Sequence, residues 1–222
     1  MIKDLAIVIV SCDRYSYFWK YWYYYFKKNF GFKIAPVYLL RETRPANMDN
    51  VIEIGSERTD VHQWVRKLEE GIAQIPEQNL FIMMDDMLIL KDITKRFVKL
   101  YDMFLEVDAL RIMPGRCANH TIKDTLLSLN GEPISVLSQD SAYQISFSPN
   151  IWKRPFLMDC LKTRGSPWHS ELHGSKRMKR RGYTQLQYII DDWYYPAIRQ
   201  GTMQDRGREL IKAINHDNKG KT

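Results

Sequence analysis

Short runs of apolar residues alternate, along the first half of the chain, with longer stretches in which apolar residues recur every three or four positions. The short runs predict buried strands, and the longer stretches predict amphipathic helices. We expect strands at 5–10, 34–40, 51–54, 80–84 and 109–113, with helices that begin near residues 18, 60 and 92. Strands that alternate with helices form mostly parallel sheets covered on both faces. The pattern therefore predicts the α/β fold class.

Particular residues mark the ends of these predicted helices. Gly31 follows the first helical pattern and suits a C-terminal cap. Asp60, with Gln63 three residues later, has the spacing of a capping box, and Asp92 precedes the third pattern. The first pattern is an aromatic stripe of Phe18, Trp19, Trp22, Tyr23, Phe26 and Phe30. We interpret the stripe as core packing, with an exposed sugar-stacking platform as the alternative.

The second half of the chain is less regular. We expect strands at 134–137, 142–147 and 185–190, and a helix at 149–161 with Pro155 near its start. The strand at 142–147 rests on the alternation of apolar and polar residues. No internal repeat or low-complexity linker interrupts the sequence, so we expect a single domain over 1–215. The polar residues 216–222 are expected to form a disordered tail.

The composition adds information about partners and environment. The net charge of +7 favours anionic partners such as nucleotides, phosphates, nucleic acid or anionic lipid. Part of the basic excess lies at 176–181, which is either a solvated surface or an anion-binding segment. No apolar run approaches the roughly 20 residues of a membrane span. The widely spaced Cys12, Cys117 and Cys160 indicate a reducing, cytoplasmic environment and argue against a structural zinc site.

The strongest functional signal is a pair of carboxylates inside an apolar run. Asp85 and Asp86 interrupt the run 80–90, although isolated ionised carboxylates cost many kcal/mol in an apolar medium. We therefore expect the strand to end at this pair and to open into a cleft, where ligands bind in open α/β sheets. Adjacent carboxylates there suit Mg²⁺ or Mn²⁺. The structural alternative is a helix N-cap or a salt-bridged turn.

A polar loop, Ser11-Cys12-Asp13-Arg14, directly follows the first predicted strand. It faces the same edge of the sheet as Asp85, so the two segments should converge. Arg14 suits a phosphate group, and Asp13 suits a base or ribose hydroxyl. The alternative for Asp13 is an ordinary cap of the aromatic helix.

The segment around Trp168 and Glu171 is a third candidate. Trp168 suits a wall of an acceptor site, and Glu171 suits a general base. The alternative is a buried tryptophan with a capping glutamate. The histidines lack metal-ligand spacing such as HExxH, and the absence of GxSxG, GxxxxGK[ST] and GxGxxG removes the hydrolase, P-loop and dinucleotide interpretations.

Taken together, these segments resemble a family of GT-A type glycosyltransferases of bacteria and phages, which transfer sugars from nucleotide diphosphate donors. The matching segments, in the expected order, are 11–15, 81–89, 146–157, 166–175 and 195–201. The resemblance implies one GT-A-like (Rossmann-like) domain, with a nucleotide-binding half at 1–115 and an acceptor-side half at 116–215. GT-A enzymes commonly carry Asp-x-Asp, and Met84 stands at the first of these places. Asp86 is therefore the better metal candidate of the pair.

The resemblance also implies a role for each candidate residue. Asp86 would bind Mn²⁺ or Mg²⁺ on the diphosphate, and the metal would offset the charge of the leaving group. The residues implied for the nucleotide sugar are Ser11, Cys12, Asp13, Arg14 and Asp85. Lys176 and Arg177 are further candidates for offsetting the charge of the diphosphate.

On the acceptor side, Glu171 would deprotonate a hydroxyl of a saccharide or other acceptor, so that it attacks the anomeric carbon with inversion. Asp191 or Asp192 is the alternative base. Trp168 and His169 would contact the acceptor.

Two other functions remain open on the sequence. The acidic residues and a basic face would suit a metal-dependent nuclease or phosphotransferase, although no nucleic-acid motif occurs. A catalytically inactive sugar-binding or scaffold domain on the same fold is the second.

Overall fold

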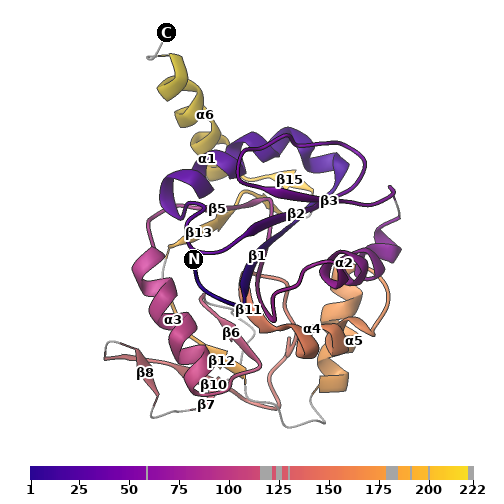
Figure 1. The fold of residues 1–222 in the computed structure, drawn as a ribbon, viewed down its shortest axis with the longest axis vertical. Coiled ribbons are helices and arrows are strands. Elements are labelled where there is room, and N and C mark those ends of the chain that lie inside the picture. Colours follow the sequence, from indigo (N-terminus) through magenta and orange to yellow (C-terminus); the bar gives the residue numbers. More distant parts are fainter. Residues whose placement is uncertain are drawn as a thin grey trace.

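The computed structural model describes residues 1–58, 60–115, 122–123, 127–129, 131–178, 185–190, 192–199 and 201–219, and of 122–123 and 215–219 the backbone alone. In these ranges the main sheet has nine strands in the order β3-β2-β1-β4-β11-β6-β12-β10-β7 (Figure 1). In chain order these are β1 (Leu5–Val10), β2 (Val37–Arg41), β3 (Ile52–Gly55), β4 (Asn79–Met84), β6 (Arg111–Met113), β7 (Ile122–Lys123), β10 (Ser135–Leu137), β11 (Asn150–Lys153) and β12 (Gln185–Gln187).

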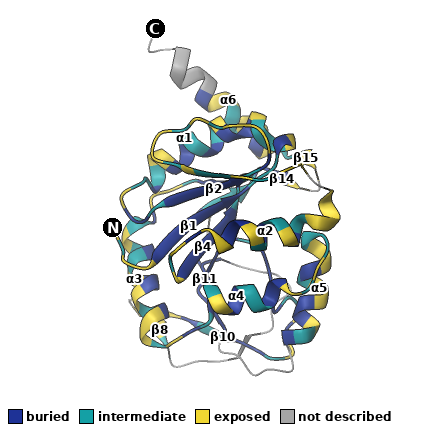
Figure 2. Ribbon diagram, turned by 45° about the vertical axis from the view of Figure 1, so that its right-hand side comes forward, coloured by how far each residue is buried: buried dark blue, intermediate teal, exposed yellow. Residues whose placement is uncertain are grey.

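The sheet is mostly parallel, as the sequence predicts. The pairing partners give β11 and β10 the opposite direction to all the others. Helices cover both faces of the sheet. Successive residues of β1 point to opposite sides of the sheet, and since all of them are apolar, both sides must be covered. Leu5, Ile7 and Ile9 belong to one buried cluster, and the residues between them belong to the other. Figure 2 shows that β1 is buried between the layers. The α/β fold class is confirmed.

The helices divide between these two clusters. The first cluster contains residues of α1 (Trp19–Asn29) and α3 (Thr94–Glu106). The second contains residues of α2 (Trp64–Ala73), α4 (Arg154–Leu161) and α5 (Pro167–Met178). Short 3₁₀ helices precede α1 (η1, Asp13–Phe18) and α2 (η2, Val61–Gln63), and α6 is Asp205–Lys219. None of the helices in the described ranges is long and apolar enough to cross a membrane.

The residues predicted at the helix ends make capping contacts, although α2 and α3 begin only at Trp64 and Thr94. Gly31 follows α1 with a φ of 76°, which glycine adopts at no steric cost. The Asp60 side chain accepts a hydrogen bond from the His62 N–H at 2.8 Å. Asp92 accepts one from the Thr94 N–H, also at 2.8 Å. The aromatic stripe packs in the core, where Trp22 is 1% exposed, except that Tyr23 is only partly buried.

The order of the strands produces a crevice at the edge where β1 and β4 end. The chain moves outward from β1 through β2 to β3, and then returns to place β4 on the other side of β1. The loops after β1 and β4 meet at this switch point, and the elements that follow them, α1 and β5, both contribute to the first cluster. Val10 and Met84, the last residues of the two strands, are direct partners.

The carboxylate pair divides its apolar run into two strands. Asp85 and Asp86 form the turn after β4, and β5 (Met87–Ile89) leaves the main sheet. It pairs instead with β13 (Tyr194–Pro196), beside a hairpin of β14 (Ile198–Arg199) and β15 (Thr202–Met203). The remaining hairpin joins β8 (Ser128–Leu129) and β9 (Glu132–Pro133). Apolar residues flank the turn on both sides because each side is a separate buried strand.

The sequence prediction fails at one strand and at the start of one helix. Residues 142–147 form no strand, and β11 lies at Asn150–Lys153, where the sequence predicts a helix; α4 begins only at Arg154. The reason is that the Asn150 amide donates to the backbone oxygens of Ser146 and Ser148, at 2.9 and 2.6 Å, and holds this segment as a loop. At the C-terminus, α6 continues through 216–219, the start of the predicted tail.

Candidate functional site

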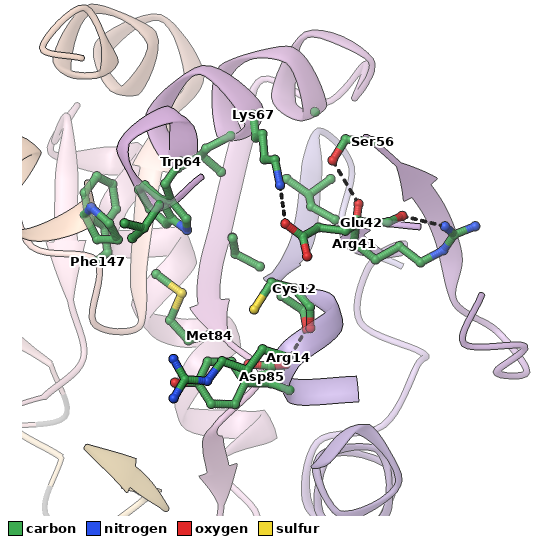
Figure 3. Close-up of a pocket in the computed structure, with 18 of the residues that line it drawn as sticks. Cys12, Arg14, Arg41, Glu42, Ser56, Trp64, Lys67, Met84, Asp85 and Phe147 are labelled. Carbon is green, nitrogen blue, oxygen red and sulfur yellow. Dashed lines mark hydrogen bonds and ion pairs between the residues drawn. The ribbon is translucent and has the colours of Figure 1, made fainter. Parts of the chain in front are cut away.

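A pocket of about 1200 Å³ lies at the switch point, between the ends of β1 to β4 and the helices α2 and α5 (Figure 3). All three segments singled out in the sequence contribute to it. The loop after β1 contributes Ser11, Cys12 and Arg14; the turn after β4 contributes Asp85 and Asp86; α5 contributes Trp168 and Glu171. The expected convergence of the loop after β1 with Asp85 is confirmed, and the structure adds α5 to the same pocket.

Asp85 is the buried centre of a hydrogen-bond network that joins the end of β4 to the loop after β1. The Ser11 hydroxyl and the Trp19 Nε1–H, at 3.1 Å, both donate to Asp85 Oδ2. Trp19 Nε1 also lies 2.6 Å from Ser11 Oγ. Burial, together with the adjacent Asp86, raises the pKa of Asp85 to about 8. The side chain is therefore mostly uncharged at pH 7 and acts as a brace between segments.

Asp86 has a different environment. Its backbone oxygen accepts a hydrogen bond from the Ala197 N–H at 2.8 Å, which fixes the turn. Its carboxylate Oδ1 is buried and has no hydrogen-bond partner within the described part of the chain. Burial raises the pKa of Asp86 to about 6. Asp86 is therefore the member of the pair whose carboxylate remains available to a cation.

A divalent cation fits Asp86 only when other ligands complete its coordination. In the described ranges no three His, Cys, Asp or Glu side chains are close enough to hold a metal together. Mg²⁺ is usually bound by one or two carboxylates, several waters and the phosphates of a substrate. The single buried carboxylate oxygen fits a cation that arrives with a diphosphate.

An ion pair between the end of β2 and α2 also lines the pocket, and the sequence pattern did not predict it. The carboxylate of Glu42, after β2, is bonded to Lys67 Nζ on α2 and accepts a hydrogen bond from the Asp13 N–H at 2.9 Å (Figure 3). The two side chains are only 8% and 14% exposed, and both line the pocket. The position of Glu42 directly after a buried strand, like that of Asp85, was the available signal.

The α5 side of the pocket combines a carboxylate with aromatic rings. Glu171 Oε1 accepts a hydrogen bond from the Phe147 N–H at 2.7 Å. Burial raises the pKa of Glu171, although hydrogen bonds and the nearby charge of Arg111 act in the other direction. Trp64 packs edge-on against Phe147 with centroids 4.8 Å apart, and Trp168 is 59% exposed at the pocket wall. This wall suits a ligand with an apolar face.

The remaining residues after β1 differ in their access to the pocket. Arg14 is exposed on the pocket lining, and its guanidinium lies beside Gly201 of the β14–β15 hairpin. Cys12 also lines the pocket, and burial followed by the charge of Asp85 raises the pKa of its thiol. Asp13 is not on the lining, because its carboxylate accepts from Thr43 Oγ1 and from the Arg44 N–H at 3.0 Å. Contrary to the sequence interpretation, Asp13 organises the loop after β2.

Two further candidates are not brought into the pocket. Asp192 is exposed in a turn with a φ of 50°, so the geometry gives no support to it as an alternative base. His169 is exposed on α5 and stacks on His173, with ring centroids 4.1 Å apart, rather than lining the pocket. Asp191, together with 179–181 of the basic run, lies outside the described residues.

Comparison with known proteins identifies the fold. No protein-family model matches the sequence, and no curated protein matches it. Among solved structures, residues 1–349 of S. aureus TarS align with a TM-score of 0.57 at 11% identity, over 87% of this chain and 60% of TarS 1–349. The complex of TarS 1–349 with UDP-GlcNAc aligns with a TM-score of 0.57 at 12% identity, over 96% of this chain and 65% of that one.

A second structure is matched over nearly its whole length. UTP-bound UGPase from Acinetobacter baumannii aligns with a TM-score of 0.57 at 10% identity, over 97% of this chain and 93% of that chain. These likenesses show that the chain has a nucleotide-diphospho-sugar transferase-like fold of the GT-A type. The chain spans about 60% of the length of TarS 1–349.

Asp85→Asn tests the buried brace through the pH dependence of stability. Because the pKa of Asp85 is raised from 3.8 to about 8, its stabilising contribution is complete below about pH 4 and is lost as the pH rises through 8. Between pH 4 and 8 we expect the free energy of unfolding of the wild type to fall by several kcal/mol relative to that of Asp85→Asn, because one pKa unit corresponds to about 1.4 kcal/mol. Urea unfolding across this range measures the difference. Parallel stability curves for the two proteins would contradict the assignment.

Proposed function

We propose that the protein is a glycosyltransferase that transfers a sugar from a nucleoside diphosphate donor to an acceptor hydroxyl with the assistance of a divalent cation. The observation that carries the proposal is the pocket at the β1–β4 switch point. It combines the unpartnered carboxylate oxygen of Asp86, the half-buried Glu171 and the Glu42–Lys67 pair on one surface. The solved complexes of TarS with UDP and with UDP-GlcNAc support it by analogy of fold.

The Glu42–Lys67 pair suits the base of the nucleotide. A carboxylate oxygen accepts from an N–H group, and an ammonium donates to a carbonyl oxygen. Uracil and guanine present an N–H beside a carbonyl, whereas adenine has no carbonyl. Since TarS was solved with UDP, we propose a uridine nucleotide as the donor. Arg14, exposed on the same lining, would pair with the phosphates.

Asp86 would hold Mn²⁺ or Mg²⁺ together with the oxygens of the diphosphate. Such a cation, when bound, offsets the negative charge that builds on the leaving diphosphate. The turn that carries Asp86 is held by the Ala197 N–H, so its carboxylate is positioned before a ligand arrives.

Glu171 would act as the general base of the transfer. It accepts the proton of the acceptor hydroxyl as that oxygen attacks the anomeric carbon, and the bond from this carbon to the diphosphate breaks with inversion. The raised pKa of the half-buried Glu171 strengthens it as a proton acceptor. The exposed ring of Trp168 would stack on the apolar face of a sugar acceptor.

Nucleotidyl transfer is the second candidate function, because the UTP-bound UGPase is matched over 93% of its chain. It would require the pocket to hold a triphosphate. Loops that cradle several phosphates are usually rich in glycine, whose backbone N–H groups approach the oxygens closely. Residues 11–18 contain no glycine. The β1 loop therefore favours a donor with a diphosphate.

Glu42→Gln tests nucleotide binding and the base site together. We expect wild-type protein to bind UDP more tightly than ADP in calorimetric titrations, and Glu42→Gln to weaken UDP binding about tenfold, equivalent to about 1.4 kcal/mol. Glu106→Gln, an exposed change on α3, is the matched control. Wild-type protein that binds no uridine nucleotide would contradict the proposed function. Unchanged binding in Glu42→Gln would contradict only the base site.

Asp86→Asn tests the cation site. In wild-type protein we expect Mn²⁺ to strengthen UDP binding at least tenfold, because the cation links the carboxylate to the diphosphate. This effect should disappear in Asp86→Asn and persist in Asp192→Asn, whose side chain is exposed outside the pocket lining. Calorimetric titration of UDP with and without Mn²⁺ measures both. Full Mn²⁺ dependence in Asp86→Asn would exclude Asp86 as the ligand.

Glu171→Gln separates catalysis from structure. A glutamine oxygen still accepts the Phe147 N–H, so the melting temperature and UDP affinity should change little. We expect UDP release from UDP-GlcNAc to fall by roughly 10²–10⁴-fold, the usual contribution of a general base. Normal turnover in Glu171→Gln would remove the base role and leave Glu171 as an anchor of the Phe147 loop.

A further inference from the structure

The segment from Arg14 to Arg41 is unusual in charge and composition. It contains no acidic residue, and its basic residues are Arg14, Lys20, Lys27, Lys28, Lys33 and Arg41. More than half of the 13 tyrosines of the chain fall within it, at positions 15, 17, 21, 23, 24, 25 and 38. Helix α1 lies at the centre of this segment.

The outward side of α1 gathers these lysines and tyrosines on one face. At 100° per residue, the positions on this arc of α1 are Lys20, Tyr21, Tyr23, Tyr24, Lys27 and Lys28. Together with Tyr17 of the preceding η1, they form what we call the Lys–Tyr face. All three lysines are exposed, and Tyr17, at the end of η1, is 56% exposed. The opposite side of the helix, with Trp22 and Phe26, is buried in the core. The core thus fixes the orientation of the face.

Each lysine on this face is paired with a tyrosine ring. The ammonium groups of Lys20, Lys27 and Lys28 lie 4.8, 5.9 and 5.7 Å from the ring centroids of Tyr21, Tyr23 and Tyr24, respectively. These distances are within the range of cation–π attraction. One side of each ring is thus covered by an ammonium group, which disfavours the face-on stacking that single-stranded nucleic acid uses. The pairs present positive charge next to amphipathic aromatic rings.

Asp49 and Asp205 lie near the margins of the face. Tyr23 donates from its hydroxyl to the backbone oxygen of Asp49 at 3.3 Å, so this carboxylate lies at one edge. On another side, Tyr25 donates to the backbone oxygen of Leu210 in α6 at 3.2 Å. There, Asp205 of α6 is paired with Arg208 at 2.9 Å. The charge of the face itself remains positive.

The Lys–Tyr face begins at the edge of the candidate pocket. Tyr15, in the same 3₁₀ helix as Tyr17, lines the pocket. α1 then extends away from the pocket along the outside of the molecule, beside the start of α6 (Figures 1 and 2). A surface that contacts this face would also lie beside the opening of the pocket.

We propose that the Lys–Tyr face docks the protein on the surface of an anionic lipid bilayer. Lysines near such a surface are attracted by its negative potential, and tyrosine rings favour the boundary between headgroups and acyl chains. Lysine provides a point charge, whereas specific recognition of single phosphates favours the planar fork of arginine, which the face lacks. The Lys–Tyr face therefore suits many weak contacts with the anionic headgroups of a lipid surface rather than one specific phosphate site. This proposal does not depend on the proposed transferase activity.

Flotation with vesicles tests the proposal on the full chain. We expect the wild type to bind phosphatidylcholine vesicles that contain about 30% phosphatidylglycerol. Binding to vesicles of pure phosphatidylcholine should be weak. The variant K20Q/K27Q/K28Q should lose binding on the order of a hundredfold, since each lysine contributes about tenfold or less. The variant K3Q/K95Q/K99Q removes the same charge from exposed lysines elsewhere and should bind as the wild type does. Tyr17→Ser should weaken binding severalfold.

Several results would overturn the proposal. Equal losses in the two triple variants would show a general effect of net charge. Equal binding to vesicles with and without phosphatidylglycerol would exclude anionic recognition. Binding of a 20-residue oligothymidylate, lost in K20Q/K27Q/K28Q and without any vesicle binding, would assign the face to nucleic acid. Calorimetric titration with UDP reports the pocket separately, so failure of the docking surface and failure of the transferase function are distinguishable.

Discussion

The hydrogen bonds around the buried carboxyl group of Asp85 are the interaction on which the site depends. They join three elements: β4, through Asp85 itself; the loop after β1, through Ser11; and α1, through Trp19. Because a buried carboxyl group without partners would cost several kcal/mol, these contacts hold the two loops at the switch point in one arrangement. The pocket floor is thus fixed by a group that is itself mostly withdrawn from solvent.

This arrangement gives two adjacent residues different tasks. Both residues lie in the turn after β4, but Asp85 is buried among hydrogen-bond donors, whereas Asp86 keeps a carboxylate oxygen that has no partner among the described residues. Both have raised pKa values because both are buried, but only Asp85 has side-chain donors that satisfy it. Of the two carboxylates, the proposed cation site therefore uses only that of Asp86.

The pocket and the Lys–Tyr face are linked through the same short segment. Ser11 and Trp19 hold the network, Arg14 and Tyr15 line the pocket, and the exposed lysines of α1 follow directly. A change in the position of η1 would therefore alter the pocket and the outward face together. The proposed donor site and the proposed docking surface share one structural support.

The sequence by itself determined the α/β fold class and the helix caps at Asp60 and Asp92, because hydrophobic periodicity and capping are local properties. It also determined the convergence of 11–14 with Asp85 and Asp86, because the ends of neighbouring parallel strands meet at one edge of the sheet. Tertiary structure alone decided which side chains face the pocket. The Asp13 carboxylate accepts hydrogen bonds from Thr43 and Arg44, and Glu42 forms an ion pair with Lys67 of another element. Asn150 turns an alternating segment into a loop. These contacts depend on residues from other elements, so the local pattern of residues does not predict them.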